Sequence, residues 1–260
     1  MPEHQIIQGD CLEVRPVHKQ DSRFFYRQHH YAPEKCGIEK YALGLFKDNQ
    51  MRGTMMLGWG TRPLHTIRRL FPSLGTADYL EICKLCLDDE MPRNSESWFL
   101  ARSIAWLKTA FPHLSILYTW ADGLFGKPGY VYQAANFLYG GYITSEAYFN
   151  QEGERSHPRR LITEFGHRDR VFTETLGLTK VWGPQFRYCY FLGSRKHTKE
   201  LLRESTVPWT RDYPKENEIQ CQIQAGEGSR VNCRPPKPCG VVRFDTPAPN
   251  LFGEAHSCST

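Results

Sequence analysis

The sequence lacks a long apolar run: no stretch reaches the roughly 18 consecutive apolar residues that a membrane span needs. Its first residues, MPEHQIIQGD, lack the basic start and apolar core of a secretory signal. Repeats and low-complexity tracts are absent as well. The 40% hydrophobic and 23% charged content is typical of globular proteins, and 260 residues suffice for one good-sized core. We therefore expect a cytoplasmic protein.

The cysteines do not form the framework of a disulfide-rich domain, because their number, nine, is odd and their spacing is irregular. Cys83 and Cys86 form a Cys-x-x-Cys pair inside the apolar run YLEICKLCLDD. A structural zinc site needs a second pair at matching spacing, and none follows closely. We predict that these two thiols are buried or inert.

Positive charge is concentrated in one region. The net charge of the chain is only +5, whereas residues 155–203 hold eleven Lys and Arg against four Asp and Glu. Such a local excess suits a polyanion, because neutralised phosphates release condensed counterions. A solvated surface with scattered arginines is the alternative.

The hydrophobic pattern predicts an α/β fold. Apolar residues 80–88, a helix beginning at Asn94 or Ser95, and the run 114–122 indicate strand, helix and strand with parallel neighbours. A helix and a strand follow at 130–141 and 142–149. The remaining expected elements are strands 7–16, 41–46, 53–60 and 186–193, a helix at 22–31, and a basic helix ending near Arg203.

We divide the chain into a catalytic domain, residues 1–203, and a tail, residues 204–260. Beyond Pro208 the composition shifts to Pro, Gly, Gln, Asn and Cys. Such a segment buries little apolar surface. We expect the tail to be irregular or partly disordered and to wrap around the surface.

Two turns follow the central strands. In the first, residues 91–97, free backbone N–H groups at a helix start lie beside Arg93 and favour an anion. In the second, Asp122 ends a strand and the glycines that follow, among them Gly126 and Gly129, allow close approach of a ligand. Tyr132 comes in the next helical turn. A carboxylate and a phenol can serve as base and acid; the alternative is that Asp122 is a structural cap.

Residues 29–31, His-His-Tyr, lie near the end of the first expected helix. Adjacent helical residues point about 100° apart, so we expect only one of the two histidines to face a site.

Four segments in order resemble the Mom family of phage adenine-modification proteins. They are His29-His30-Tyr31, GWGTRPLHTIRRLFP, EICKLCLDDEMPRNSES and YTWADGLFGKPGYVYQAANFLYGG, and the similarity spans residues 20–193. The resemblance implies a GNAT-like mixed sheet flanked by helices. It also implies that the protein converts adenine in DNA to a carbamoylmethylated form, which protects phage DNA from restriction in the host cytoplasm.

Carried over by motif, the resemblance implies a catalytic set and a ligand set. Asp122, Tyr132, His30 and Tyr31 would be catalytic, with iron as a cofactor held by His30. A small donor of the acyl-CoA type or another kind would be bound by Arg93, Asn94, Ser95, Ser97, Gly126 and Gly129. The loop Arg-Asn-Ser-Glu-Ser nevertheless lacks the two glycine positions of the usual GNAT pyrophosphate loop, so the motif favours the fold more than it favours acyl-CoA.

The implied chemistry requires access to a base inside double-stranded DNA. The exocyclic amine of adenine is a weak nucleophile, and the base must be flipped out of the stack. Trp59, Tyr139 or Trp182, if exposed, would stack on it. The carbamoylmethyl group is joined through carbon, so plain acyl transfer does not give it. Two other functions stay open, namely a conventional GNAT N-acetyltransferase acting on a small amine or a protein, and a non-catalytic DNA-binding protein.

Overall fold

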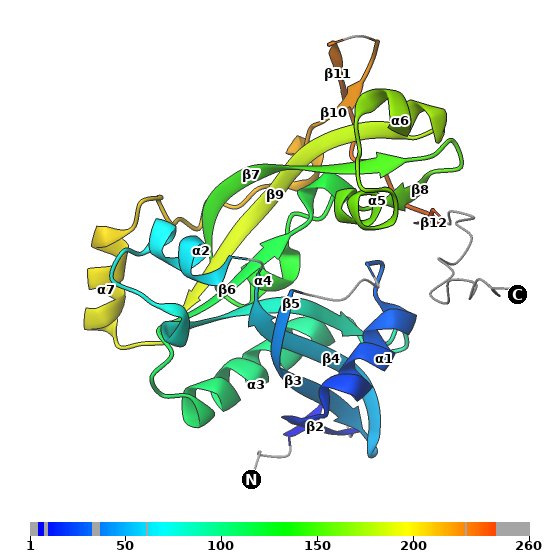
Figure 1. The fold of residues 1–260 in the computed structure, drawn as a ribbon. Coiled ribbons are helices and arrows are strands. Elements are labelled where there is room, and N and C mark those ends of the chain that lie inside the picture. The colour runs from blue at the N-terminus through cyan, green and yellow to red at the C-terminus, as the bar shows by residue number, and fades with distance from the viewer. Residues whose placement is uncertain (1–4, 8–9, 33–36, 61, 227, 243–260) are drawn as a thin grey trace, which may run out of the picture.

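A single mixed β-sheet forms the centre of the computed structural model, which describes residues 5–7, 10–32, 37–60, 62–226 and 228–242 (Figure 1). Its strands run in the order β1-β2-β3-β4-β5-β6-β9-β7-β8-β12, with β10 beside β9 and β11 beside β10. The bounds are β1 Gln5–Ile7, β2 Asp10–Pro16, β3 Ile38–Lys47, β4 Gln50–Trp59, β5 Tyr79–Leu87, β6 Ile116–Ala121, β7 Leu138–Phe149, β8 Glu154–Ser156, β9 Thr179–Phe191, β10 Cys221–Gln224, β11 Arg230–Cys233 and β12 Gly240–Val241.

Helices cover both faces of this sheet. α3 and α4 pack on one face against Leu80 and Ile82, whereas α1, α2 and α7 pack on the other. The helices are α1 Lys19–His29, α2 Pro63–Leu70, α3 Ser95–Ala110, α4 Tyr130–Ala134, α5 Pro158–Phe165, α6 Arg170–Thr175 and α7 Arg195–Glu204, with 3-10 turns at η1 Thr76–Asp78, η2 Gly123–Phe125 and η3 Glu216–Glu218. Within the described residues no helix has the length and apolar character of a membrane span.

The strands β5 and β6 are adjacent and parallel, as predicted. Their ladder ends at Ile82 opposite Thr119, although β5 continues to Leu87. At the same point Cys83 is an extra residue that has no partner in β4, because Met56 pairs with Lys84 and Leu57 with Ile82. Such a bulge bends a strand. The predicted GNAT-like mixed sheet is thus confirmed, and its two central parallel strands part at their carboxyl ends.

The helix predicted over residues 130–141 begins at Tyr130 as expected, but the prediction is wrong beyond Ala134. α4 ends at Ala134, because Asn136 adopts a positive φ of 62° that turns the chain away from the helix. Residues 138–141 instead belong to the start of β7. β7 does not extend the parallel pair, since β9 lies between it and β6 and is antiparallel to both.

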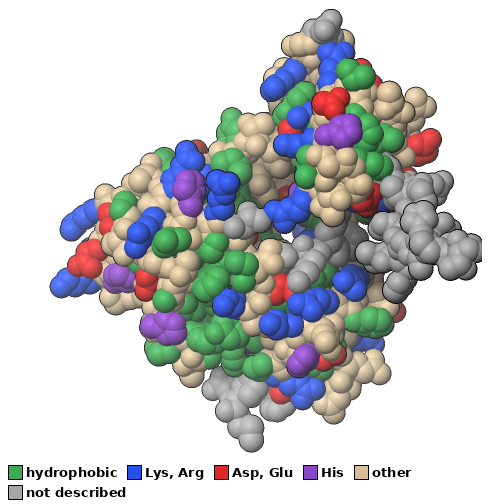
Figure 2. All heavy atoms as spheres, in the orientation of Figure 1, with side chains coloured by type: hydrophobic (Ala, Val, Ile, Leu, Met, Phe, Trp, Pro, Cys, Tyr) green, Lys and Arg blue, Asp and Glu red, His purple; other side chains and the backbone are tan. Residues whose placement is uncertain are grey.

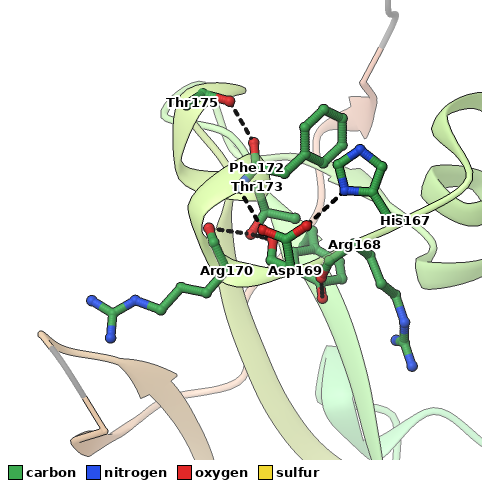
Figure 3. A network of polar contacts seen from close by, with 8 residues as sticks. His167, Arg168, Asp169, Arg170, Phe172, Thr173 and Thr175 are labelled. Carbon is green, nitrogen blue, oxygen red and sulfur yellow. Dashed lines mark hydrogen bonds and ion pairs between the residues drawn. The ribbon is translucent and has the colours of Figure 1, made fainter.

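The outer halves of β7 and β9 leave the rest of the sheet and form an arm with β8, β10, β11, α5 and α6, seen at the top of Figure 1. The carboxylate of Asp169 caps α6 by accepting the backbone N–H of Phe172 at 3.0 Å (Figure 3). Asp169 also accepts a hydrogen bond from His167 at 2.6 Å.

The segment after α7 is more regular than its composition predicts. Trp209 stacks on Phe71, which directly follows α2, with ring centroids 5.6 Å apart, and Thr210 forms a bridge with Tyr139. β10 pairs with Val181 and Trp182 of β9, whose edge offers unpaired backbone groups. This part of the predicted tail thus contains short strands joined by irregular segments, and residues 243–260 lie outside the described residues. The domain boundary itself stays a prediction.

Candidate active site

Asp122 lies directly after β6, where the chain turns into η2. Its backbone carbonyl accepts hydrogen bonds from the N–H groups of Phe125 and Lys127, at 2.9 and 3.1 Å, and so holds the turn together. Its side chain does not cap η2. Instead the carboxylate accepts a hydrogen bond from the hydroxyl of Tyr31. The interpretation of this side chain as a structural cap is therefore wrong.

His30 and Tyr31 follow α1 and stack on each other, with ring centroids 4.5 Å apart. The backbone N–H of Ala32 donates to Nδ1 of His30 at 2.9 Å, which fixes the imidazole. His29 points elsewhere and stacks on Phe25 of its own helix. Only His30 therefore joins the site, as the spacing predicts.

Burial controls the protonation of this pair. Burial, and then the positive charges of Lys84, Lys127 and Arg155, lower the pKa of His30 to about 3. Burial, and then the negative charge of Asp122, raise the pKa of Tyr31 well above its usual value. At neutral pH the imidazole is therefore uncharged and the phenol keeps its proton, which it donates to Asp122.

Tyr132, on α4, is buried against the rings of Phe137 and Tyr188 at 5.5 and 5.6 Å. Burial raises the pKa of its phenol to about 12, a contact with the hydroxyl of Thr119 acts in the opposite direction, and the nearby negative charges add to the increase. Those charges include Asp122 and Glu81. The structure therefore brings the four predicted catalytic residues together around one point, although their catalytic role stays a prediction.

Three further ionisable side chains of this site were not predicted. Glu81 of β5 is largely buried, and burial raises its pKa to about 7, against the effect of a hydrogen bond from the backbone of Gly60. The ammonium of Lys127 lies 3.8 Å from the centroid of the Tyr31 ring. Arg155 of β8, only 3% exposed, donates to the carbonyl of Tyr31 at 3.3 Å.

These three residues differ in the signal that they leave in the sequence. Glu81 is a lone acid in an apolar strand, which is a detectable signal, and Lys127 lies within the glycine-rich turn. Arg155 comes from the arm, far along the chain, and has no local signal.

The predicted ligand residues of the β5–α3 loop have few polar contacts of their own. Arg93 and Asn94 are exposed, whereas Ser95 is buried. The hydroxyl of Ser97 donates to the carbonyl of Asn94 at 2.9 Å. Among the described residues, no hydrogen bond or ion pair joins these side chains to Asp122 or its neighbours. Their role in donor binding stays a prediction.

Gly126 and Gly129 have a conformational role in the second turn. Both have positive φ, 73° and 90°. A Cβ on Gly129 would also lie only 2.7 Å from the ring of Tyr188. Whether these glycines contact a ligand stays a prediction.

The aromatic residues proposed for base stacking are only partly exposed. Trp59 donates its ring N–H to the carbonyl of Tyr79 at 3.0 Å, and Tyr139 packs among other rings. Trp182 lies under Arg230, 4.1 Å from its ring. The expectation that these three are exposed is therefore wrong, because Lys40 lies over the ring of Trp59, Phe186 and Tyr188 pack on Tyr139, and Arg230 lies over Trp182. Among the described residues, the large aromatic side chains that are exposed are Phe24, Tyr41, Tyr130 and Tyr142.

The described residues do not supply a recognisable metal site. They contain no group of three or more His, Cys, Asp or Glu side chains that could hold an ion. Nδ1 of His30 is already engaged by Ala32. The donor set needed for iron is therefore not met within this part of the chain. Cys86 is buried with its thiol pKa raised to about 12 by burial, whereas Cys83 is the bulge residue of β5.

Comparisons with known proteins show the family of this chain. A model of the Mom protein family matches residues 11–215. The chain belongs to the Mom protein family. Methylcarbamoylase mom of Escherichia phage Mu is 28% identical to it over 209 residues, which cover 78% of this chain and 84% of that protein.

Among solved structures, the Mom family member is similar to two acetyltransferases at low identity. The acetyltransferase of the GNAT family from Streptococcus pneumoniae is 9% identical with a TM-score of 0.39, and the match covers 70% of this chain and 99% of that one. Ribosomal-protein-S5-alanine acetyltransferase from Vibrio fischeri is 12% identical with a TM-score of 0.39, covering 69% and 92%.

Proposed function

We propose that this Mom family member transfers a carbamoylmethyl group to the exocyclic amine of a flipped adenine in DNA. Family membership and the named activity of the phage Mu relative support this proposal. The observation that carries it is the convergence of His30, Tyr31, Asp122 and Tyr132 at the end of β6, where a second carboxylate, Glu81, lies within electrostatic range of the same phenol.

The reaction requires a base. As the amine nitrogen bonds to the methylene carbon of an acetamide-type donor, the bond from that carbon to its leaving group breaks with its electron pair, and the amine loses a proton. Glu81 suits this task, because a pKa of about 7 leaves much of it ionised at neutral pH while keeping it basic. Asp122 is the second candidate, with one oxygen held by Tyr31.

The other groups manage charge and orientation. Tyr132 keeps its proton at neutral pH and can donate it to the leaving group. The uncharged imidazole of His30 adds no positive charge next to the amine. Lys127 lies over the ring of Tyr31 and Arg155 donates to its carbonyl, and both cations favour negative charge on the donor or on the leaving group.

Mass spectrometry of nucleosides tests the proposal. Plasmid DNA from cells that express the chain should contain a modified adenosine, and the mass increment distinguishes carbamoylmethyl from acetyl. Asp122→Asn keeps the volume and removes the charge, so the yield should fall about a hundredfold to ten-thousandfold. Asp89→Asn, a change of an exposed carboxylate, is the matched control. Unmodified DNA together with tight, salt-sensitive binding would instead support a non-catalytic DNA-binding protein.

A further inference from the structure

We propose that α2 and α7 together form a basic platform that binds the phosphate backbone of duplex DNA beside the adenine to be modified. The inference rests on the proposed function, which supplies DNA as the partner. The basic platform consists of Arg62, His65, Arg68, Arg69, Arg195, Lys196, Lys199 and Arg203.

The platform is built by two helices that share one core. Ile67 and Leu70 of α2 pack in the same buried cluster as Leu201 of α7. The backbone N–H of Thr206 donates to the carbonyl of Leu70 at 3.1 Å, which ties the segment after α7 to the end of α2. With both apolar faces turned inward, the basic faces turn outward. Figure 2 shows Lys, Arg and His side chains gathered on this side of the molecule, at its left.

The charge of the platform is not neutralised. Residues 62–70 and 195–204 contain seven Lys and Arg against two Glu, a net charge of +5 that equals the net charge of the whole chain. Among the described residues, no ion pair involves the Lys and Arg of the platform. One of the two acids, Glu204, accepts a hydrogen bond from Ser73.

The basic residues of the arm are different, although they lie in the sequence region of highest positive charge. Arg160 pairs with Glu164 at 2.6 Å, Arg170 with Glu174 at 2.7 Å, and both Arg168 and Lys180 with Glu146. A Lys or Arg releases condensed counterions from DNA by neutralising a phosphate, and a cation already paired with a carboxylate is less available for this. The structure therefore favours the platform over the arm as the phosphate-binding surface.

The spacing of the platform suits a regular polyanion. Arg195, Lys199 and Arg203 recur every four residues, about 6 Å apart along α7. They line a shallow depression with Lys196 and Glu200.

The platform also lies at a defined distance from the site. α7 follows the end of β9 that pairs with Ile116, and Asp122 follows the opposite end of β6. Six strand residues span about 20 Å. At 3.4 Å for each base pair, this distance corresponds to roughly six base pairs.

Fluorescence anisotropy of the full chain with duplex DNA tests the platform. In the double variant Arg195→Gln with Lys199→Gln, affinity near 0.1 M salt should fall at least about tenfold, and the slope of log affinity against log salt should flatten by about two. The matched control is Arg102→Gln with Lys108→Gln on α3, which covers the opposite face of the sheet and also loses two charges. An equal loss in both double variants, or no loss in either, would overturn the proposal.

A length series separates the platform from the chemistry. Duplexes with one adenine and a flank shortened on one side should lose binding and modification once that flank falls below roughly six base pairs, but only on the side that reaches the platform. Loss that is equal on both sides contradicts the proposed placement. Binding that depends on the platform without any modified adenosine would defeat the proposed function alone, whereas full modification by the α7 variant would defeat the platform alone.

Discussion

The two turns that follow the parallel strands differ in what they bring to the site. The turn after β6 is largely buried: η2 is held by hydrogen bonds to the carbonyl of Asp122, and Gly129 packs beneath the ring of Tyr188. The loop between β5 and α3 is exposed at Arg93 and Asn94. Both turns follow the carboxyl ends of adjacent strands, where open α/β sheets place their sites. Position at a strand end is therefore not sufficient for a polar contact with Asp122, and packing decides which side chains make one.

The largest expected effect is a difference in adenine modification between variants of the β5–α3 loop and a variant that follows the turn after β6. Tyr132→Phe removes one hydroxyl from a buried ring and should lower adenine modification by at least about a hundredfold, because a general acid contributes that much. Arg93→Gln should change the yield by less than about threefold, since exposed charges contribute little. Nucleoside mass spectrometry measures both, and thermal unfolding checks that each variant folds.

An Arg93 variant as inactive as the Tyr132 variant would contradict this contrast. It would restore the β5–α3 loop to the site, as a contact made only when the donor binds.

A second, smaller effect is the pH dependence of the modification rate, which we expect to follow Glu81 on β5. Because burial raises the pKa of Glu81 to about 7, its basic form is lost as pH falls below that value. The modification rate measured in vitro should therefore fall about tenfold for each pH unit below roughly 6. Glu81→Gln should be slow at every pH and should lack this dependence. If the variant keeps the wild-type pH profile, Glu81 is not the base, and Asp122 takes that role.

Sequence patterns predicted the strands and the turn that carry Asp122 better than they predicted the side chains around it. The apolar runs predicted β5, β6 and their parallel pairing, and the end of the second run predicted the position of Asp122. Both signals are local in the sequence. The bulge at Cys83 also has a local signal: the inward positions Leu80 and Ile82 are followed by Leu85 and Leu87, one residue out of phase.

The contribution of the arm could not be predicted in this way. Arg155 and Tyr31 are 124 positions apart in the sequence. Their contact depends on where the pairing of β8 with β7 places Arg155. The proposed α2–α7 platform likewise joins two segments far apart in the chain, so the count of charge over residues 155–203 includes α7 but does not show that α2 lies beside it. Non-local packing leaves no periodic signal in either case.

The smallest expected effect is on the free energy of unfolding, and it compares the residues that precede α3 and α4. Asn94 before α3 and Gly129 before α4 occupy the same left-handed conformation, with φ of 73° and 90°, and neither caps its helix through a side chain. Alanine in this conformation costs about 1 kcal/mol. Asn94→Ala should therefore reduce the free energy of unfolding by about that amount, and Asn94→Gly should leave it nearly unchanged, because that position is exposed.

Gly129→Ala should cost more, about 3 kcal/mol, because the new methyl group would also lie 2.7 Å from the ring of Tyr188 and 2.9 Å from Ala121. Urea unfolding of the three variants gives these differences directly. Equal losses for the two alanine variants would mean that backbone conformation alone sets the cost at both turns. A larger loss at Gly129 would show that the turn after β6 is held by packing, which is the property that keeps Asp122 and Tyr132 in place.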